Sequence, residues 1–314
     1  MDSCAHLYEC NNVTEHPDVV AFKGFEEKIL DKILFHLAKE QNRPIRLIDI
    51  GCGTGRLHLR YGQQVHIPKL RNVFGIDFSK KMLDLAIEKI KKAGINKIAT
   101  PALSFKQGSA FDFEAEPINS IQVAVNLNNT IGTMQGQKGA VKLFQTLNRF
   151  VENTKGIAII SCYMKKYIET YALPQYESSL YICGQPIWLK PDTYSTNKYK
   201  QLSIQYKKAY SNDPFLKVDV YDIQGNLIKK NHVLKRDPDL VKQTIESGVI
   251  RTFSNYKSHW YSFQMIDNLI KIFWDSKSYH VQAKELDPKN AEQGQLAILD
   301  YGNHLQNFFE TLSN

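Results

Sequence analysis

The spacing of apolar residues predicts strands and helices that alternate along the first half of the chain. Long apolar runs are typical of strands buried on both faces, and they occur at 45–50, 121–127 and 157–163. Weaker strand patterns lie at 72–76 and 102–107. Apolar residues recur at helical spacing in 22–41, 79–93 and 136–151. This alternation predicts an α/β fold, a doubly wound parallel sheet with helices on both faces.

After residue 163 the pattern changes. Strand-like pieces follow at 179–190, 200–210, 215–222 and 226–236, and a hairpin turn is predicted at Gly225–Asn226. Most of the 16 tyrosines fall in this part of the chain. Helical spacing returns at 261–274, and two more strands are predicted at 279–285 and 295–301.

The composition of the chain excludes some classes of protein but does not identify a binding partner. A chain of 314 residues suffices for one large domain or for a core with an insertion. No apolar run approaches the roughly 20 residues that a membrane span needs, and the polar start of the chain predicts no signal peptide. Five scattered cysteines favour a cytoplasmic protein with free thiols. A metal site at Cys4, His6 and Cys10 would lack a fourth ligand, so we predict no metal site. The net charge of +8 permits RNA or an acidic substrate but does not require either.

The segment LIDIGCGTGRLHLR, at 47–60, carries the most specific chemistry. Three glycines directly after a buried strand let the backbone turn sharply, and the helix that follows presents N–H groups to a ligand. Arg56 stands where a dinucleotide fingerprint would place its third glycine, and no Lys-Ser or Lys-Thr pair of a P-loop follows. Asp77, at the tip of the next strand, suits the hydroxyls of a ribose.

The motif DIGCGTG followed by GIDFSKKML is similar to the class I S-adenosylmethionine-dependent methyltransferases. The resemblance implies a seven-stranded Rossmann-like sheet whose last two strands form an antiparallel pair. It implies S-adenosyl-L-methionine across the carboxyl ends of the first, second and fourth strands. The core would comprise residues 1–163 and 258–314. Residues 164–257 would be a β-rich insertion after the fifth strand, forming a substrate lid or a homo-oligomer contact.

The same resemblance assigns cofactor roles residue by residue. Asp49 would face the amino end, Asp77 would accept from the ribose hydroxyls, and Phe78 and Met82 would flank the adenine, although Met82 also suits a core position. Ser109 stands where relatives usually carry an acid that reaches the adenine, with Asp112 as a second candidate whose simpler role is a cap or a solvated turn. The remaining predicted cofactor contacts come from the glycine loop, the loop after residue 107 and the fourth strand: Gly51, Cys52, Gly53, Gly55, Arg56, Ala110, Asn126 and Leu127.

The methyl acceptor is predicted to meet the segment NLNNTIGTM, which follows the fourth strand. Asn128, Asn129 and Thr130 would project into the acceptor site, or alternatively only cap the loop. His259, beside Trp260 and Tyr261, could accept a proton or be a packed structural residue. Tyr8 could fold over the cofactor or be an exposed residue of the tail.

The sequence leaves three functions open. The first is a small-molecule methyltransferase, with N-methylation favoured over O-methylation. The second is an RNA or mRNA-cap methyltransferase, which the charge and the Tyr- and Lys-rich insertion favour, although the fourth strand lacks an N/D-P-P-Y tetrad. The third is a binding scaffold that keeps the cofactor site without an acceptor. We expect no membrane partner.

Overall fold

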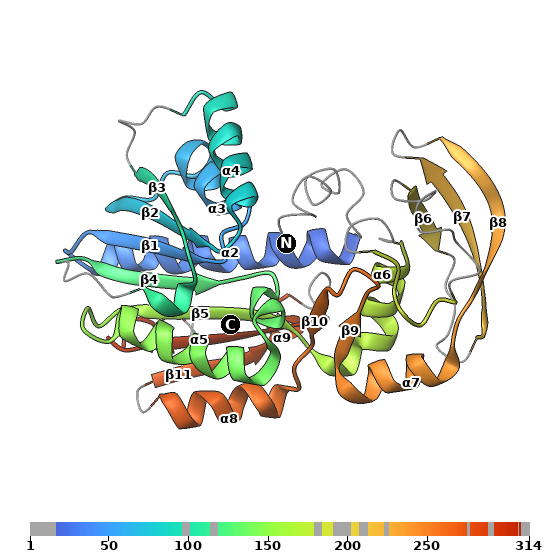
Figure 1. Cartoon of the computed structure of the whole chain (residues 1–314). Coiled ribbons are helices and arrows are strands. Elements are labelled where there is room, and N and C mark those ends of the chain that lie inside the picture. The colour runs from blue at the N-terminus through green and yellow to red at the C-terminus, as the bar shows by residue number, and fades with distance from the viewer. Residues whose placement is uncertain are drawn as a thin grey trace. The chain divides into compact units, whose positions relative to one another are not determined.

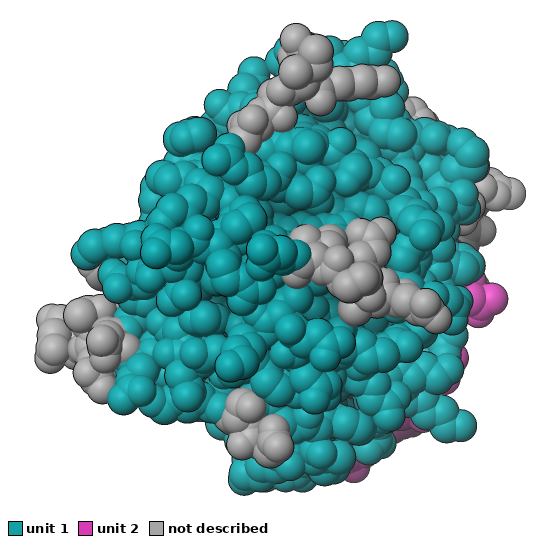
Figure 2. Space-filling view, turned by 90° about the vertical axis from the view of Figure 1, so that its left-hand side faces the viewer, with its two compact units in different colours: residues 1–2, 21–162, 263–314 teal, residues 3–20, 163–262 magenta. Residues whose placement is uncertain are grey.

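The structure is a computed structural model that describes residues 17–95, 101–113, 119–178, 184–190, 202–206, 213–222, 226–274, 277–287, 292–306 and 308. The chain divides into two compact units, which Figure 2 colours separately. Unit 1 holds residues 1–2, 21–162 and 263–314, and unit 2 holds residues 3–20 and 163–262.

A seven-stranded sheet forms the centre of unit 1, with strand order β11-β12-β5-β4-β1-β2-β3 (Figure 1). The strands β1 to β5 run parallel, and β11 pairs antiparallel with β12. Every residue of β4 and β5 is buried, as the continuous apolar runs at 121–127 and 157–163 predict, and every residue of β12 is buried too. Their bounds are β1 Ile45–Ile50, β2 Leu70–Asp77, β3 Ala102–Gln107, β4 Ile121–Asn126, β5 Ile157–Tyr163, β11 Lys277–Gln282 and β12 Gly294–Asp300. The predicted fold class is confirmed.

Helices cover both faces of this sheet (Figure 1). The chain passes from β1 to β3 in one direction across the sheet and from β4 to β5 in the other. Because such connections are right-handed, α3 and α4 lie on one face and α5 lies on the opposite one. The direction reverses between β1 and β4, and ligands of such sheets bind at the carboxyl ends beside that point. The helices of this unit are α2 Pro17–Glu40, which begins in unit 2, α3 Arg56–Leu59, η3 Arg60–Gln64, α4 Lys80–Lys92, η4 Ala110–Asp112, η5 Thr130–Thr133, α5 Gly136–Val151, α8 Phe263–Phe273 and α9 Ala283–Leu286.

Unit 2 contains a three-stranded antiparallel sheet in the order β6-β7-β8 and a smaller pair of β9 with β10. The buried carboxylate of Glu177 organises its interior, because it binds Arg236 and the indole of Trp188. The elements of this unit are η6 Lys165–Tyr167, η7 Ile168–Ala172, α6 Leu173–Ser178, β6 Leu202–Tyr206, β7 Phe215–Asp222, β8 Leu227–Lys235, α7 Pro238–Ser247, β9 Val249–Arg251 and β10 Lys257–His259.

Two parts of the structure differ from the sequence-based prediction. The insertion is mixed rather than only β-rich, because the unpredicted helix α7 follows β8. Asp237 caps that helix by accepting from the N–H groups of Asp239 and Leu240, Pro238 takes its first turn, and Gly248 ends it with φ 74°.

The second difference lies in the predicted strand 279–285. The strand ends at Gln282, because a capping box of Gln282 and Glu285 starts α9 there. The predicted β7–β8 hairpin is present, and Gly225 of its turn lies outside the described residues.

Candidate functional site

The glycine loop turns between β1 and α3 in a conformation that other residues rarely adopt. Gly51, Gly53 and Gly55 have φ angles of 74°, 53° and 77°. The N–H groups of Gly51 and Cys52 both donate to the carbonyl of Ile76 at the end of β2, at 2.8 and 3.1 Å. A Cβ at Gly53 would meet no atom within 4 Å, so this part of the loop borders open space. A ligand can therefore approach the backbone closely at Gly53.

Asp77 ends β2 with a half-buried carboxylate that is held on both sides. One oxygen accepts from the N–H of Gly53 at 2.8 Å, and the other accepts from the N–H of Ser79 at 2.8 Å. A carboxylate accepts hydrogen bonds on both of its oxygens, so a ribose diol is a chemically suitable donor to this group. Ser79 also caps α4 by accepting from the N–H of Met82 at 3.2 Å. The turn thus fixes the direction of the one acid that the sequence predicts for a ribose.

The loop after β4 touches the glycine loop. The methyl group of Thr130 fills the space where a Cβ on Gly51 would lie. Thr130 is itself held by Leu127, whose carbonyl accepts from its N–H at 3.1 Å and from its hydroxyl at 2.6 Å. Asn126 donates its side-chain amide to the carbonyl of Ile50 at 2.8 Å, which ties the end of β4 to the end of β1. The structure therefore brings the predicted acceptor residues and the predicted cofactor loop together.

Asn128 and Asn129 form a strained turn at this point. Their φ angles are 54° and 55°, and two successive side-chain-bearing residues in the left-handed region are uncommon. The carbonyl of Asn129 accepts from the N–H of Gly132 at 2.8 Å. Strain of this kind persists only where surrounding contacts hold it, and it gathers at functional sites.

Asp49 lies at the buried centre of the site, in β1 before the glycine loop. Burial raises the pKa of Asp49 to about 7; the positive charge of Arg56 lowers it, and the negative charges of Asp77 and Glu26 raise it. A cation placed nearby would favour the charged form. The thiol of Cys52 stays protonated because burial, and then the charges of Asp49 and Asp77, raise its pKa. This electrostatic balance suits a positively charged ligand.

Arg56, predicted to contact the cofactor, directs its guanidinium towards helix α2. It donates to Glu26 at 2.8 Å, to Glu27 at 3.1 Å and to the carbonyl of Lys23 at 3.2 Å. A direct contact of Arg56 with the cofactor stays a prediction. The sequence-based reasoning missed Glu26, although its position on the apolar stripe of α2 signals it: it stands four residues after Phe22 and three before Ile29, both buried.

The side predicted for adenine shows both exposed and buried residues. Phe78 leaves 78% of its surface exposed, whereas Met82 is 2% exposed. Ser109 caps η4 by accepting from the N–H of Phe111 at 3.2 Å, and Ala110 behind it is buried. The N–H of Gly108 donates to the carbonyl of Asp77 at 3.0 Å, which brings the loop after β3 next to the tip of β2.

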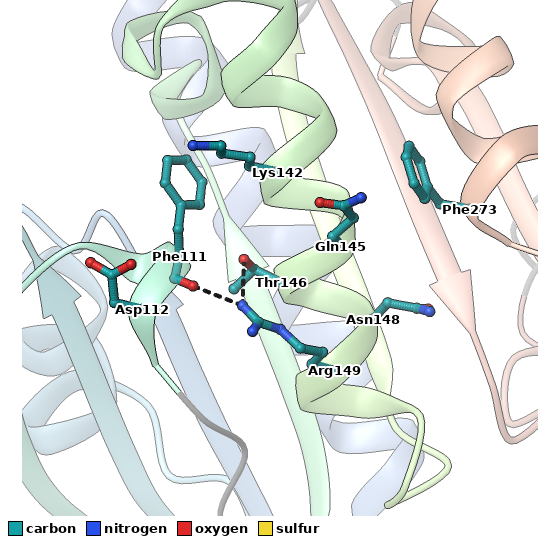
Figure 3. A pocket seen from close by; sticks show the side chains of 8 residues that line it. All are labelled: Phe111, Asp112, Lys142, Gln145, Thr146, Asn148, Arg149 and Phe273. Atoms are coloured by element: carbon teal, nitrogen blue, oxygen red, sulfur yellow. Dashed lines mark hydrogen bonds between the residues drawn. The ribbon is translucent and has the colours of Figure 1, made fainter.

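Asp112, the second adenine candidate, lines a surface groove formed with α5 and α8 (Figure 3). In this groove Arg149 donates to the carbonyl of Phe111 at 2.8 Å and to the hydroxyl of Thr146 at 3.2 Å (Figure 3). The other side chains that line it are Lys142, Gln145, Asn148 and Phe273. A contact of Asp112 with adenine stays a prediction.

His259 belongs to unit 2, where it ends β10. Its ring lies 6.4 Å from that of Tyr261, nearly parallel. Burial lowers the pKa of His259, with further lowering from Lys257 and Arg251, which favours the neutral imidazole. Its catalytic role stays a prediction, and Tyr8 lies outside the described residues.

The residues of unit 1 fit S-adenosyl-L-methionine. The cofactor combines a ribose diol, an adenine and two positive charges with one carboxylate. Asp77 supplies a carboxylate that the backbone holds in place and that suits the diol, and Phe78 presents an exposed ring next to it. Asp49 provides a negative charge that a cation would stabilise, and Gly53 leaves room for a close approach. We find no mismatch between these groups and the cofactor.

Comparison with known proteins agrees with this assignment. The family model for a methyltransferase domain matches residues 41–244. The demethylmenaquinone methyltransferase of Lactobacillus johnsonii is 41% identical over 63 residues, which are 20% of this chain and 23% of that protein. The ubiquinone/menaquinone biosynthesis C-methyltransferase of Geotalea uraniireducens is 30% identical over 112 residues, which are 34% of this chain and 43% of that protein. The chain thus spans less than half the length of these two relatives.

Solved structures give similar matches at low identity. An S-adenosylmethionine-dependent methyltransferase from Clostridium acetobutylicum aligns with a TM-score of 0.47 and 13% identity, covering 94% of this chain and 96% of that one. A second, from Methanosarcina mazei, aligns with a TM-score of 0.44 and 12% identity, covering 83% and 93% of the two chains.

Among the described residues, every helix is too short or too polar to cross a lipid bilayer.

Proposed function

The chain belongs to the class I S-adenosylmethionine-dependent methyltransferases, and on this premise we propose that it methylates a small polar molecule, on nitrogen in preference to oxygen. The observation that carries the proposal is the contact between Thr130 and Gly51. It places the strained Asn128–Asn129 turn directly beside the loop that we assign to the cofactor. An acceptor bound at this turn would lie next to the cofactor loop.

When bound, the cofactor supplies an activated methyl group on a sulfonium. The residues of the chain then need to bind, orient and exclude water. Asp77 and the backbone at Gly53 hold the ribose side, and Asp49 balances positive charge at the amino end. Orientation of the acceptor can contribute about 7 kcal/mol or more of the rate enhancement in well-aligned cases.

The amides of Asn128 and Asn129 favour a nitrogen acceptor. An amine has a lone pair for attack once its ammonium form has lost one proton, and amide oxygens can accept its remaining N–H groups and so fix its direction. An alcohol that has lost its single proton has no hydrogen left for these amide oxygens to accept, so they would fix its direction less well. The neutral His259 is our candidate for removing a proton from the acceptor.

A second candidate function is C-methylation of a quinone-related ring. The 112-residue similarity to the C-methyltransferase of Geotalea uraniireducens favours it. An RNA acceptor is the third candidate, and it rests on the net charge of +8. RNA binding should weaken steeply between roughly 50 and 200 mM salt.

The decisive experiment follows a carbon-13-labelled methyl group from the cofactor into a fractionated cell extract. We expect label in the low-mass fraction, with the carbon-13 shift of an N-methyl group. An O-methyl or C-methyl shift would replace the nitrogen assignment, and label in RNA or protein would contradict a small-molecule acceptor. Asn129→Ala should lower turnover more than cofactor affinity, whereas a parallel loss of both would contradict its place in the acceptor site.

A further inference from the structure

We propose that Glu26 is a positioning residue for methyl transfer, because its carboxylate fixes the Asn128–Asn129 turn against the rest of the site. The effect on turnover rests on the proposed function. The effect on the turn does not, and it can be measured without any acceptor.

Glu26 is an unusual residue for the interior of a helix packed on a sheet. Its side chain is 0% exposed, whereas Glu27 next to it is 21% exposed. Removing a carboxylate from water is strongly unfavourable unless close partners compensate. A leucine at this position would avoid that cost, so the contacts of Glu26 indicate what the charge does there.

The carboxylate joins four elements of unit 1. Its Oε1 atom accepts from the N–H of Asn128 at 2.6 Å and from the hydroxyl of Ser161 in β5. Its Oε2 atom accepts from Arg56 in α3 at 2.8 Å. The Ser161 oxygen also accepts from the N–H of Asn128, at 2.9 Å. One buried side chain on α2 therefore meets α3, β5 and the loop after β4.

The contact with Asn128 acts on the strained part of the site. Asn128 is the first of the two residues with positive φ, and its N–H is the group that Glu26 and Ser161 hold. Asparagine adopts the left-handed conformation at a lower cost than most other side-chain-bearing residues, and a charge-assisted hydrogen bond to the first N–H of the turn stabilises it further. Glu26 thus stabilises the turn that carries Asn128 and Asn129.

Arg56 does not need Glu26 to stay in place, because Glu27 and the carbonyl of Lys23 also bind it. Within the described residues, Glu27 accepts from Arg56 and Arg60 and makes no hydrogen bond with the Asn128–Asn129 turn. The two neighbouring acids of α2 therefore share an arginine but differ at the turn. This makes Glu27→Gln a matched control for Glu26→Gln.

The test compares these two variants with the unmodified protein. In Glu26→Gln one end of the amide is a donor, so it cannot satisfy both Arg56 and Asn128 as an acceptor. We expect faster amide hydrogen exchange in 127–130 and an affinity for S-adenosylhomocysteine within about threefold of the unmodified protein. We expect kcat to be lower by about 10- to 100-fold, because a displacement of the acceptor by about 1 Å can slow the reaction by that much. In Glu27→Gln, the exchange rates at the turn, the affinity for S-adenosylhomocysteine and kcat should each stay within about twofold of the unmodified protein.

Unchanged exchange at the turn in folded Glu26→Gln would overturn the positioning role, whatever the acceptor is. If Glu27→Gln changed exchange at the turn as much as Glu26→Gln does, the effect would come from general stabilisation of α2. That result would also overturn the positioning role of Glu26. If Glu26→Gln does not fold, Ser161→Ala decides, because it removes one of the two groups that hold Asn128 without touching Arg56. Faster exchange at 127–130 in that variant supports the proposal, and no change contradicts it. Changed exchange with no methyl transfer to any fraction would instead count against the proposed function.

Discussion

The two units each bury a glutamate against an arginine, and the two pairs are built differently. Glu177 in unit 2 receives the fork of Arg236 on both oxygens, at 2.7 and 2.8 Å, and both side chains are almost completely buried. Glu26 in unit 1 gives only one oxygen to Arg56, which is 28% exposed, and uses the other for Ser161 and the backbone of Asn128. The first pair is bidentate and lies in the interior of unit 2, where Trp188 also donates to Glu177, whereas the second holds a loop.

The difference teaches how to distinguish a buried charge that supports a fold from one that supports a site. A closed bidentate pair can often be replaced by apolar residues of similar volume without loss of stability. A carboxylate that binds the backbone of a strained turn cannot be replaced in that way, because the N–H group of the turn would lose its acceptor. We therefore expect the consequences of mutation in the two units to separate into stability and site geometry.

The largest effect is expected from Glu177→Ala. Breaking a buried pair leaves Arg236 without its partner carboxylate and should lower the free energy of unfolding by about 3–5 kcal/mol. Urea unfolding measures this loss. The double variant Glu177→Met/Arg236→Met is the control and should recover most of it. A loss below about 1 kcal/mol in the single variant would contradict the closed-pair interpretation.

Asp49 gives the next effect, on the pH dependence of stability. Its pKa is about 7 in the folded protein and near 3.8 when unfolded, so between these values the folded state keeps a proton that the unfolded state has lost. Stability should therefore fall as the pH rises from about 4 to 7, by up to about 4 kcal/mol. Asp49→Asn should remove this slope in urea unfolding measured across that range. Equal slopes in both proteins would rule out the raised pKa.

Asp77→Ala should weaken binding of S-adenosylhomocysteine by about 30- to 100-fold, since hydrogen bonds to a charged group contribute about 2–3 kcal/mol. Asp84→Ala is the matched control, because Asp84 is an exposed acid on α4 that pairs with Lys80. Calorimetric titration measures both variants. Normal affinity in folded Asp77→Ala would show that the ribose assignment is wrong.

The smallest effects are expected from alanine substitutions at Gly51 and Gly53, whose surroundings differ. Alanine at either Gly51 or Gly53 should cost about 1 kcal/mol, because both have positive φ. Gly51→Ala should cost more, since its Cβ would collide with the methyl group of Thr130, and Thr130→Ser should relieve that excess. Gly53→Ala should instead weaken cofactor affinity. Thermal unfolding and titration of the same variants separate the two outcomes.

The sequence predicts much of unit 1 because its signals are local. The bounds of β1, β3, β5 and α5 agree with the predicted ranges, since continuous or periodic apolar patterns define them. The order of glycine loop, Asp77 and the β4 tip also fixes which edge of the sheet carries the site. Helix α7 carried readable local signals, the Asp237 cap and Gly248, but lay among strand-like segments that dominated the interpretation.

The contacts of Glu26 could not be predicted in the same way. Its partner groups on Arg56, Asn128 and Ser161 lie 30, 102 and 135 residues away in the chain. No periodicity links such positions, because only the folded sheet brings the loop after β4 next to β5 and α2. An acid on the apolar stripe of a helix signals that a partner exists without identifying it.

The most direct test of the central claim is amide hydrogen exchange with and without S-adenosylhomocysteine. We expect slower exchange with the ligand bound in the glycine loop at 51–56, at the β2 tip at 77–82 and in the loop at 126–130. We expect no change at 215–222 and 227–235, the strands of unit 2. Protection confined to those strands or to the groove beside α5, with the glycine loop unaffected, would contradict the account.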